Sequence, residues 1–333
     1  MNTAKTIFVM GLICLMLFWA GCKQGQPVTQ EAQEVKKVEA VKPVKEVKME
    51  ITPAWSGDYK ISMSSHRSVG FEGPLKGDKD FKGGTTGSQM EMVFNQQIED
   101  INEDGSAVAR ITIKELKYLN KVKDDVRIDF DSAADTQKTS PLSKLVGVSY
   151  TIVFTPDGKI AKVADTGEAK KLLQGQKTEN QLAVRILSNE SVKERHQLPL
   201  PGRQFVVADG ARWSDTKTLE MGLMGKKSYE RVYTVSGAEN PDGEEVVINM
   251  EAIPGGEPEG EKVGMESFSK MFDNKEIYNG KIIYNSDNGY VKNWSETFEA
   301  EWVVVEPDAG TADKEPSAVK MKSEQAFKLE KLN

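Results

Sequence analysis

Hydrophobic and polar residues alternate with period two over much of the chain between residues 51 and 305, where β-branched and aromatic residues are frequent. Such alternation places apolar side chains on one face of a strand. It predicts a mainly β domain with minor α (α+β), built from antiparallel strands. The expected strands cover residues 90–98, 107–116, 148–154, 159–163, 228–235, 245–252, 280–285, 290–294 and 297–305.

Four short turns separate pairs of these strands. In each turn a glycine follows Asp or Asn, a combination that accepts the positive φ of hairpin turns. The four are "NEDGS" at Asn102, "TPDGK" at Thr155, "NPDGE" at Asn240 and "SDNGY" at Ser286. We predict a hairpin at each of them.

The order of features repeats along the domain. Gly105 is nearly as far from Gly243 as Gly158 is from Gly289, and each half carries a helix-prone patch, "SPLSKLVG" or "ESFSKMF". The domain, residues 51–305, is therefore predicted to hold two similar antiparallel halves, at about 55–165 and 203–305. Together they would form a curved sheet or half-barrel. Chance similarity of β-rich segments is the alternative to duplication.

A helical segment at 166–196 separates the two halves. Residues 165–168 and 178–181 have the spacing of capping boxes. The apolar residues that could form one stripe are Leu182, Ile186, Leu187 and Val192. A stripe of this kind predicts packing on the sheet, and a mobile lid over a cavity is the alternative. The prolines of "LPLPGR" predict an extended crossing to the second half.

Polar segments flank the domain. Residues 22–50 are rich in Lys, Glu, Val and Pro, and from residue 24 on they contain no aromatic residue, which predicts a flexible tether. Residues 306–333 predict a polar C-terminal tail with at most a short helix near 323–332. The net charge is −7 and no basic patch stands out, so nucleic acid is not an expected partner.

Residues 1–21 have the features of a secretion signal. Lys5 precedes an apolar stretch of about fourteen residues, which is shorter than the roughly twenty that a spanning helix needs. The "WAGC" of residues 19–22 resembles the bacterial lipobox, although Trp19 stands where an aliphatic residue is usual. The resemblance implies cleavage between Gly21 and Cys22 and acylation of Cys22. Ordinary secretion is the alternative.

The lipobox resemblance also implies an address. A lipidated Cys22 would anchor the protein in a membrane by its N-terminus, because several acyl chains bind durably where one chain does not. Lys23 follows the cysteine, and it is not the Asp that retains such proteins at the inner membrane. For a source with two membranes, we therefore expect a cell-envelope protein at the outer membrane, facing the periplasm.

The sequence offers little catalytic or metal chemistry. There are two histidines, His66 and His196, and no HExxH, GxSxG or P-loop motif. Cys14 would leave with the signal, so no free thiol would remain. The acidic run at 123–136, "KDDVRIDFDSAADT", could supply oxygen ligands to calcium, but it lacks the EF-hand glycine, which favours a solvated strand face. We expect no catalytic residue, no metal and no cofactor, and we expect His196 to be a surface or capping residue.

Several motifs together resemble a family of uncharacterised bacterial lipoproteins with one large extracytoplasmic β-rich domain. They are "INEDGSAVARITI" at Ile101, "SPLSKLVGVSYTIVFTPDGKIAKV" at Ser140, "LPLPGRQFVVADGARWSD" at Leu198 and "GKIIYNSDNGYVKNWSETFEAEW" at Gly280. These motifs are structural and imply no catalytic residue. A more distant likeness, in architecture alone, is to the β half-barrels of lipoprotein carriers and lipid-binding envelope lipoproteins, and architecture does not imply function.

Two functional hypotheses remain. The first is a non-enzymatic module that binds an apolar ligand or lipid between sheet and helices, which requires a sizeable apolar cavity under residues 166–196. The second is a structural or protein-interaction lipoprotein of the envelope, with a filled core and an exposed patch or sheet edge. Four tryptophans are expected to pack in the core or at an edge, or to line a ligand platform: Trp55, Trp213, Trp294 and Trp302.

Overall fold

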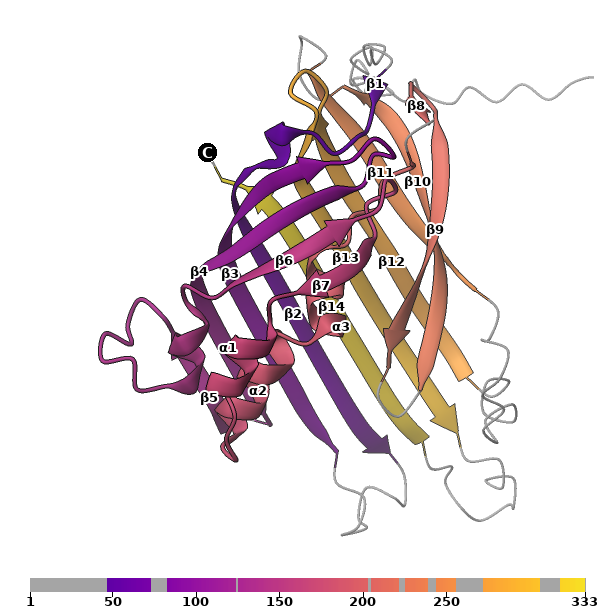
Figure 1. The fold of residues 1–333 in the computed structure, drawn as a ribbon. Helices are drawn as coiled ribbons and strands as arrows, with labels where there is room; N and C mark the ends of the chain where they lie inside the picture. The colour runs from indigo at the N-terminus through magenta and orange to yellow at the C-terminus, as the bar shows by residue number, and fades with distance from the viewer. Residues whose placement is uncertain are drawn as a thin grey trace, which may run out of the picture. The chain divides into compact units, whose positions relative to one another are not determined.

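A computed structural model shows one 12-stranded antiparallel sheet that curves strongly without closing on itself (Figure 1). The structure describes residues 47–72, 83–123, 125–202, 205–221, 225–238, 244–255, 272–305 and 318–332. Neighbouring strands follow the order β7-β6-β4-β3-β2-β14-β13-β12-β11-β10-β9, and β5 pairs with β4 off this path. The predicted mainly β fold with a curved antiparallel sheet is confirmed.

The strands before the helices are β1 (Val47–Lys48), β2 (Gly57–Glu72), β3 (Gly84–Ile101), β4 (Ala107–Val122), β5 (Asp125–Asp131), β6 (Ser149–Phe154) and β7 (Ile160–Ala164). Those after them are β8 (Val206–Val207), β9 (Arg212–Glu220), β10 (Lys226–Ala238), β11 (Glu245–Pro254), β12 (Phe272–Asn285), β13 (Tyr290–Val305) and β14 (Ala318–Lys331). The helices are η1 (Pro53–Trp55), η3 (Pro141–Leu145), α1 (Gly167–Leu172), α2 (Thr178–Ile186) and α3 (Asn189–His196).

The predicted strands and hairpins correspond closely to the observed ones. Each predicted range falls on an observed strand to within a residue, although 290–294 and 297–305 belong to the single strand β13. Gly105, Gly158 and Gly289 adopt φ of 85°, 78° and 68°, as their turns require. The turn at Asn240 lies outside the described residues, but β10 and β11 pair antiparallel on either side of it.

Both halves of the chain cross the sheet in the same direction. Strands β2 to β7 run from the centre to one edge, and β9 to β13 run from the other edge back to the centre. The patch "SPLSKLVG" contains η3, whereas "ESFSKMF" lies almost wholly outside the described residues. The shared strand order is compatible with duplication, which stays a prediction.

The C-terminal segment corrects the sequence prediction. Residues 306–333 were expected to be a polar tail with at most a short helix, but Ala318–Lys331 form β14, which pairs with β13 on one side and β2 on the other. Its inward-facing Met321, Phe327 and Leu329 are buried in the core. Polar residues at two of the inward positions, together with many Lys and Glu, concealed the strand.

The folded part also begins earlier than predicted. Val47–Lys48 pair with Val206–Val207, and Met49 is fully buried. The last residues assigned to the tether, 47–50, therefore belong to the domain. The rest of the predicted tether lies outside the described residues.

The helical segment predicted at 166–196 is confirmed, but it is divided into three short helices. Ser188 interrupts the second predicted helix, since its hydroxyl accepts a hydrogen bond from the backbone N–H of Ser191 at 3.1 Å and caps α3. Neither predicted capping box makes a side-chain cap. The four apolar residues of the predicted stripe are all buried. Among the residues that the structure describes, every helix is too short or too polar to cross a lipid bilayer.

The extended segment that follows α3, predicted from the prolines of "LPLPGR", lies between the two edges of the sheet. The backbone N–H of Leu198 donates to the carbonyl of Gly158 in the β6–β7 turn at 2.8 Å, and the indole of Trp213 on β9 donates to the carbonyl of Pro199 at 3.0 Å. A Cβ at position 158 would come within 2.6 Å of the Leu198 oxygen. Glycine is therefore needed both for the turn and for this close approach.

Candidate ligand-binding cavity

The inward side chains on the concave face of the sheet change from apolar to partly polar along the strands. One row of directly opposed inward residues is wholly apolar: Met92, Ile61, Leu329, Trp294, Ile282, Ile248 and Val235. Four residues further along β2, about 14 Å away, the corresponding row contains Ser88, Ser65, Gln325, Phe298 and Tyr278. The interior thus passes from an apolar core to a surface that can form hydrogen bonds.

A cavity of about 700 Å³ extends over this change of character, between the sheet and the helices α2 and α3. Its apolar wall is formed by Met63, Met90, Leu182, Ile186, Leu219, Phe298 and Phe327. Its polar wall includes Ser65, Arg67, Ser88, Arg195, Glu296 and Gln325. The volume lies within the range of about 300–1,000 Å³ that is typical of small-molecule sites.

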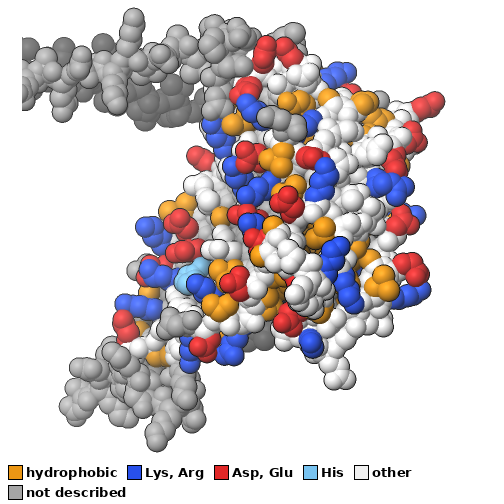
Figure 2. All heavy atoms as spheres, turned by 90° about the vertical axis from the view of Figure 1, so that its left-hand side faces the viewer, with side chains coloured by type: hydrophobic (Ala, Val, Ile, Leu, Met, Phe, Trp, Pro, Cys, Tyr) orange, Lys and Arg blue, Asp and Glu red, His pale blue; other side chains and the backbone are white. Residues whose placement is uncertain are grey.

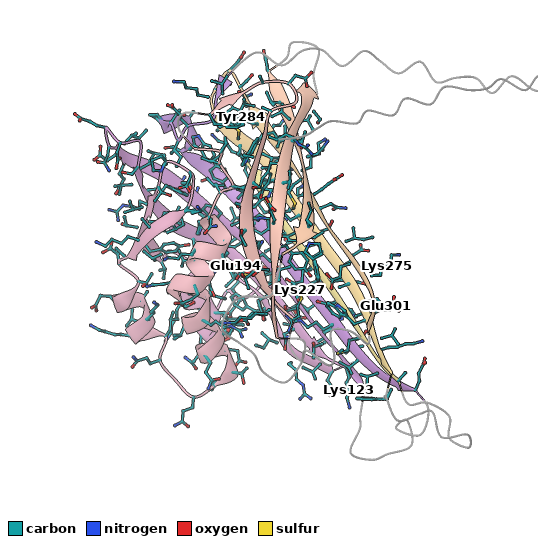
Figure 3. The ribbon with its side chains drawn as sticks, turned by 90° about the vertical axis from the view of Figure 1, so that its right-hand side faces the viewer. Lys123, Glu194, Lys227, Lys275, Tyr284 and Glu301 are labelled. Carbon is teal, nitrogen blue, oxygen red and sulfur yellow. The ribbon has the colours of Figure 1, made fainter. Side chains whose placement is uncertain are left out.

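Side chains on the two faces of the sheet have different environments. Figure 3 shows Lys275 and Glu301 on the outer side of the sheet and Glu194 on the side of the helices. On the outer face, Glu301 pairs with Lys322 at 3.2 Å, and both side chains are exposed. Figure 2 shows charged residues of both signs interspersed over one face of the protein. The outer surface therefore carries exposed charges of both signs.

The inner carboxylate of Glu296 on β13 accepts four hydrogen bonds. The donors are Arg231 Nη1 at 2.6 Å, Lys217 Nζ at 2.9 Å, Tyr278 Oη at 2.6 Å and Trp294 Nε1 at 3.1 Å. Burial favours the neutral acid and would raise the pKa of Glu296. The charges of Lys217 and Arg231 outweigh that effect and hold the pKa below its ordinary value.

Asp215 on β9 completes this ionic network. Arg231 donates to its two oxygens from Nε at 2.7 Å and from Nη2 at 2.5 Å. Two carboxylates thus balance Arg231 and Lys217. Gly280 lies opposite Glu296, and a Cβ there would be 3.2 Å from the Glu296 Cγ and 2.6 Å from the Ser295 carbonyl. The glycine therefore leaves room for the network.

A second inward carboxylate, Glu276 on β12, is held in the same way. It accepts hydrogen bonds from Lys227 at 2.6 and 2.7 Å, from Tyr229 at 3.0 Å and from Trp302 at 2.9 Å. Burial would raise the pKa of Glu276, but Lys227 and Trp302 lower it further than burial raises it. Both carboxylates are therefore satisfied by the protein itself.

Arg195, in the last turn of α3, is a different case. Its side chain is buried, with 2% exposure, and Nη2 donates to the carbonyl of Ile186 at the end of α2 at 2.8 Å. Its Nε has no hydrogen-bond partner within the described residues. Sequence reasoning missed Arg195, because one arginine in a polar helical stretch looks like a surface residue.

Several other buried donors near the cavity also lack partners. Within the part of the chain that the structure describes, the unpartnered buried side-chain atoms are Arg67 Nε, Arg195 Nε, Tyr233 Oη, Ser323 Oγ and Gln325 Nε2. Arg67, Arg195 and Gln325 line the cavity. An unpaired buried donor costs about 1–3 kcal/mol, so an acceptor placed in the cavity would be stabilised.

The tryptophans pack mainly as core residues. Trp213, Trp294 and Trp302 point to the concave face, and Trp55 is buried in η1. Trp294 lines the cavity, and the other three do not. The predicted core packing is confirmed for Trp55, Trp294 and Trp302, which are buried, and Trp213 packs against the core.

The expectation that His196 is a surface or capping residue is wrong. The side chain is 4% exposed, its Nε2 lies 2.7 Å from the hydroxyl of Tyr150, and its ring meets Phe94 edge-on at 4.8 Å. Burial lowers the pKa of His196 well below its ordinary value, so the imidazole is neutral at pH 7. His66 is exposed on β2.

Within the acidic run, Asp125–Asp131 form β5, which has a solvated face as predicted, and a turn follows the strand. Asp129 is exposed, and Asp131 pairs with Lys117 at 2.9 Å. The carboxylate of Asp135 accepts backbone hydrogen bonds from Thr139 and Ser140, each at 3.1 Å. The described residues contain no group of three or more His, Cys, Asp or Glu side chains that could hold a metal ion.

The predicted cleavage and lipidation site, Gly21 and Cys22, lies outside the described residues. Its assignment therefore remains a prediction from the sequence alone.

Comparisons with known proteins find no match in sequence and a distant likeness in structure. No family model matches the chain, and no curated protein matches it. A solved structure titled "Lipid-protein interactions in lipovitellin" is similar with a TM-score of 0.40 and 14% sequence identity, over 85% of this chain. The match spans 26% of the lipovitellin chain. A likeness this distant carries no argument about function.

Proposed function

We propose that the protein binds an amphipathic, lipid-like ligand in the cavity between the concave face of the sheet and helices α2 and α3. The observation that carries this proposal is the cavity of about 700 Å³, which joins an apolar wall to a polar one. Apolar area removed from water contributes about 25 cal/mol per Å² to binding, and a few polar groups then fix the orientation of the ligand.

The position of the cavity supports binding over a purely structural role. Towards the end of the sheet that carries η1, the interior is filled by large buried side chains such as Trp55, Tyr59 and Phe94. That packed end stabilises the scaffold without a ligand. The cavity lies under α2 and α3, which belong to the 166–196 segment. This is the position that the binding hypothesis expects. Its lining is mixed, so the ligand needs a polar part as well as an apolar one.

Filling the cavity is expected to abolish binding. Ser88 on β3 lies directly beside Ser65 of the neighbouring strand β2 and lines the cavity, so Ser88→Trp would place an indole in the ligand volume. We expect the affinity for a fluorescent fatty-acid analogue to fall by at least about tenfold, because the ligand and the indole compete for one space. Fluorescence titration measures the change.

The matched control for this substitution is Gln89→Trp, on the adjacent residue of β3, which is exposed on the opposite face. It adds the same side chain outside the cavity and is expected to leave the affinity unchanged. Thermal melts of both variants show that the fold is kept. Equal affinities of the two variants would count against the cavity as the binding site.

We also propose that the protein acts without catalysis from the cell envelope, held to the outer membrane by a lipid on Cys22. The sequence features at residues 19–22 support this proposal. In cells fed radioactive palmitate, the protein is expected to take up label, and Cys22→Ser is expected to lose it. Cys14→Ser is the control and is expected to keep the label. Label retained by Cys22→Ser would disprove the assignment.

A further inference from the structure

We infer that the cavity selects ligands with an anionic headgroup, and that Arg195 and Arg67 recognise its charge. This inference rests on the proposed binding function and specifies the chemical class of the ligand. It is independent of the membrane anchor.

The charges around the cavity are unevenly balanced. Arg231 and Lys217 are paired with Glu296 and Asp215, as described above. Arg67 and Arg195 form no salt bridge with any residue that the structure describes. An arginine remains protonated in proteins, and a buried charge without a counter-ion is unfavourable. The cavity therefore has cationic groups that the protein does not neutralise.

The groups that surround Arg195 do not supply a negative charge. Tyr150 and His196 are buried beside it, and burial keeps both neutral, since it raises the pKa of the Tyr150 phenol and lowers that of the His196 imidazole. Glu194 and Glu220 also line the cavity, but both are exposed to solvent, where water and salt weaken their charge.

Three of the four unpartnered donors on the described part of the sheet, those of Arg67, Ser323 and Gln325, lie on neighbouring positions of β2 and β14. Arg67 on β2 is directly opposite Ser323 on β14, and Ser65 is directly opposite Gln325. Arg67 uses Nη2 to donate to the carbonyl of Glu220 at 2.6 Å, which leaves its Nε free. The ionised oxygens of phosphate and carboxylate groups accept hydrogen bonds and do not donate them. A group of donors without acceptors is therefore suited to an anion.

The same arrangement gives the ligand a direction. The headgroup would lie between Arg67 and Arg195, and the apolar tail would follow Met63, Met90 and Phe327, which are directly opposed neighbours on β2, β3 and β14. These three residues also line the cavity. An anion without an apolar tail would not contact these three apolar residues and would therefore bind weakly.

Calorimetric titration with amphiphiles of one chain length tests the inference. Dodecyl phosphate, dodecanol and dodecyltrimethylammonium are compared below their micelle concentrations, with inorganic phosphate as a fourth probe. We expect dodecyl phosphate to bind at least about tenfold more tightly than dodecanol, since charge-assisted hydrogen bonds act on it alone. The cation is expected to bind most weakly of the three, and inorganic phosphate is expected to show no measurable binding.

Variants assign the preference to residues. Arg195→Met is expected to remove most of the difference between dodecyl phosphate and dodecanol while dodecanol affinity is kept, and Arg195→Lys is expected to restore part of it. Because Arg195 also caps α2, Arg67→Met serves as a second variant. Arg110→Met, an exposed arginine on β4 that pairs with Glu99 at 2.6 Å, is the control and is expected to change nothing.

The outcomes separate this inference from the binding function itself. If dodecanol and dodecyl phosphate bind equally well, binding stands and anion selection is overturned. If no amphiphile binds, the proposed binding function and the anion selection both fail. A preference that survives in Arg195→Met and Arg67→Met would overturn the assignment of these residues, and tight binding of inorganic phosphate would overturn the amphipathic ligand.

Discussion

Deletion of residues 318–333 is expected to prevent the domain from folding. β14 pairs along its whole length with β13 and β2, so its loss would leave one edge of each of these two long strands unpaired in the centre of the sheet. The deletion would also remove three buried side chains, Met321, Phe327 and Leu329, from the core. Each such loss costs about 2–5 kcal/mol, against a total stability of about 5–15 kcal/mol for a typical domain.

Circular dichroism and limited proteolysis check this prediction. The truncated chain is expected to show no cooperative melt and to be digested rapidly. A control on the same strand is the pair of outward substitutions Lys322→Ser and Glu324→Ser, which leave the inward face intact and are expected to lower the melting temperature only slightly. A cooperative melt of the truncated chain would contradict the central place of β14.

Glu296→Gln is expected to lower the free energy of unfolding by about 3–5 kcal/mol, because it leaves the buried cations of the ionic network with too little negative charge. Glu296 and Arg231 are only 2% and 3% exposed, and Lys217, which is 24% exposed, pairs with Glu296 at 2.9 Å. Urea unfolding at pH 7 measures the difference. Replacing both partners, as in Glu296→Leu with Arg231→Met, is expected to recover part of the loss.

The control for this substitution is Glu301→Gln on the outer face of the same strand, where the pair with Lys322 is exposed. There we expect a change below about 1 kcal/mol. Since the pKa of Glu296 is lower in the folded protein, its stabilisation is fully present above the unfolded value of about 4.3 and is lost as the pH falls through the folded pKa. The gap between wild type and Glu296→Gln should therefore narrow in acid. A gap that is small at pH 7 would contradict the role of the network.

Local features of the fold could be predicted because their causes lie within a few residues. The glycines at 105, 158 and 289 follow Asp or Asn and adopt the positive φ that these turns need. The alternation of β3 and β4 predicted both strands, and their inward residues are buried as expected. The helical segment was recognised from its apolar stripe, whereas the break at Ser188 was not.

The candidate site could be predicted only as a region. A cavity under residues 166–196 follows from a curved sheet and a covering helical segment, but its polar wall does not. Lys217 and Arg231 reach Glu296 from 79 and 65 positions away in the chain. No local pattern shows that these residues meet, because alternating polar residues on a strand normally indicate its solvent face.

The sequence by itself determined the strand periodicity, three of the hairpin turns, the helical segment and the mainly β character of the chain. These depend on backbone preferences and on neighbours close in sequence. The tertiary structure alone decided that β14 joins the two halves, that Arg195 and His196 are buried, and that the carboxylates of Glu276 and Glu296 face inward. Those properties depend on contacts between distant strands, since burial and charge pairing arise only when the sheet has curved around its interior.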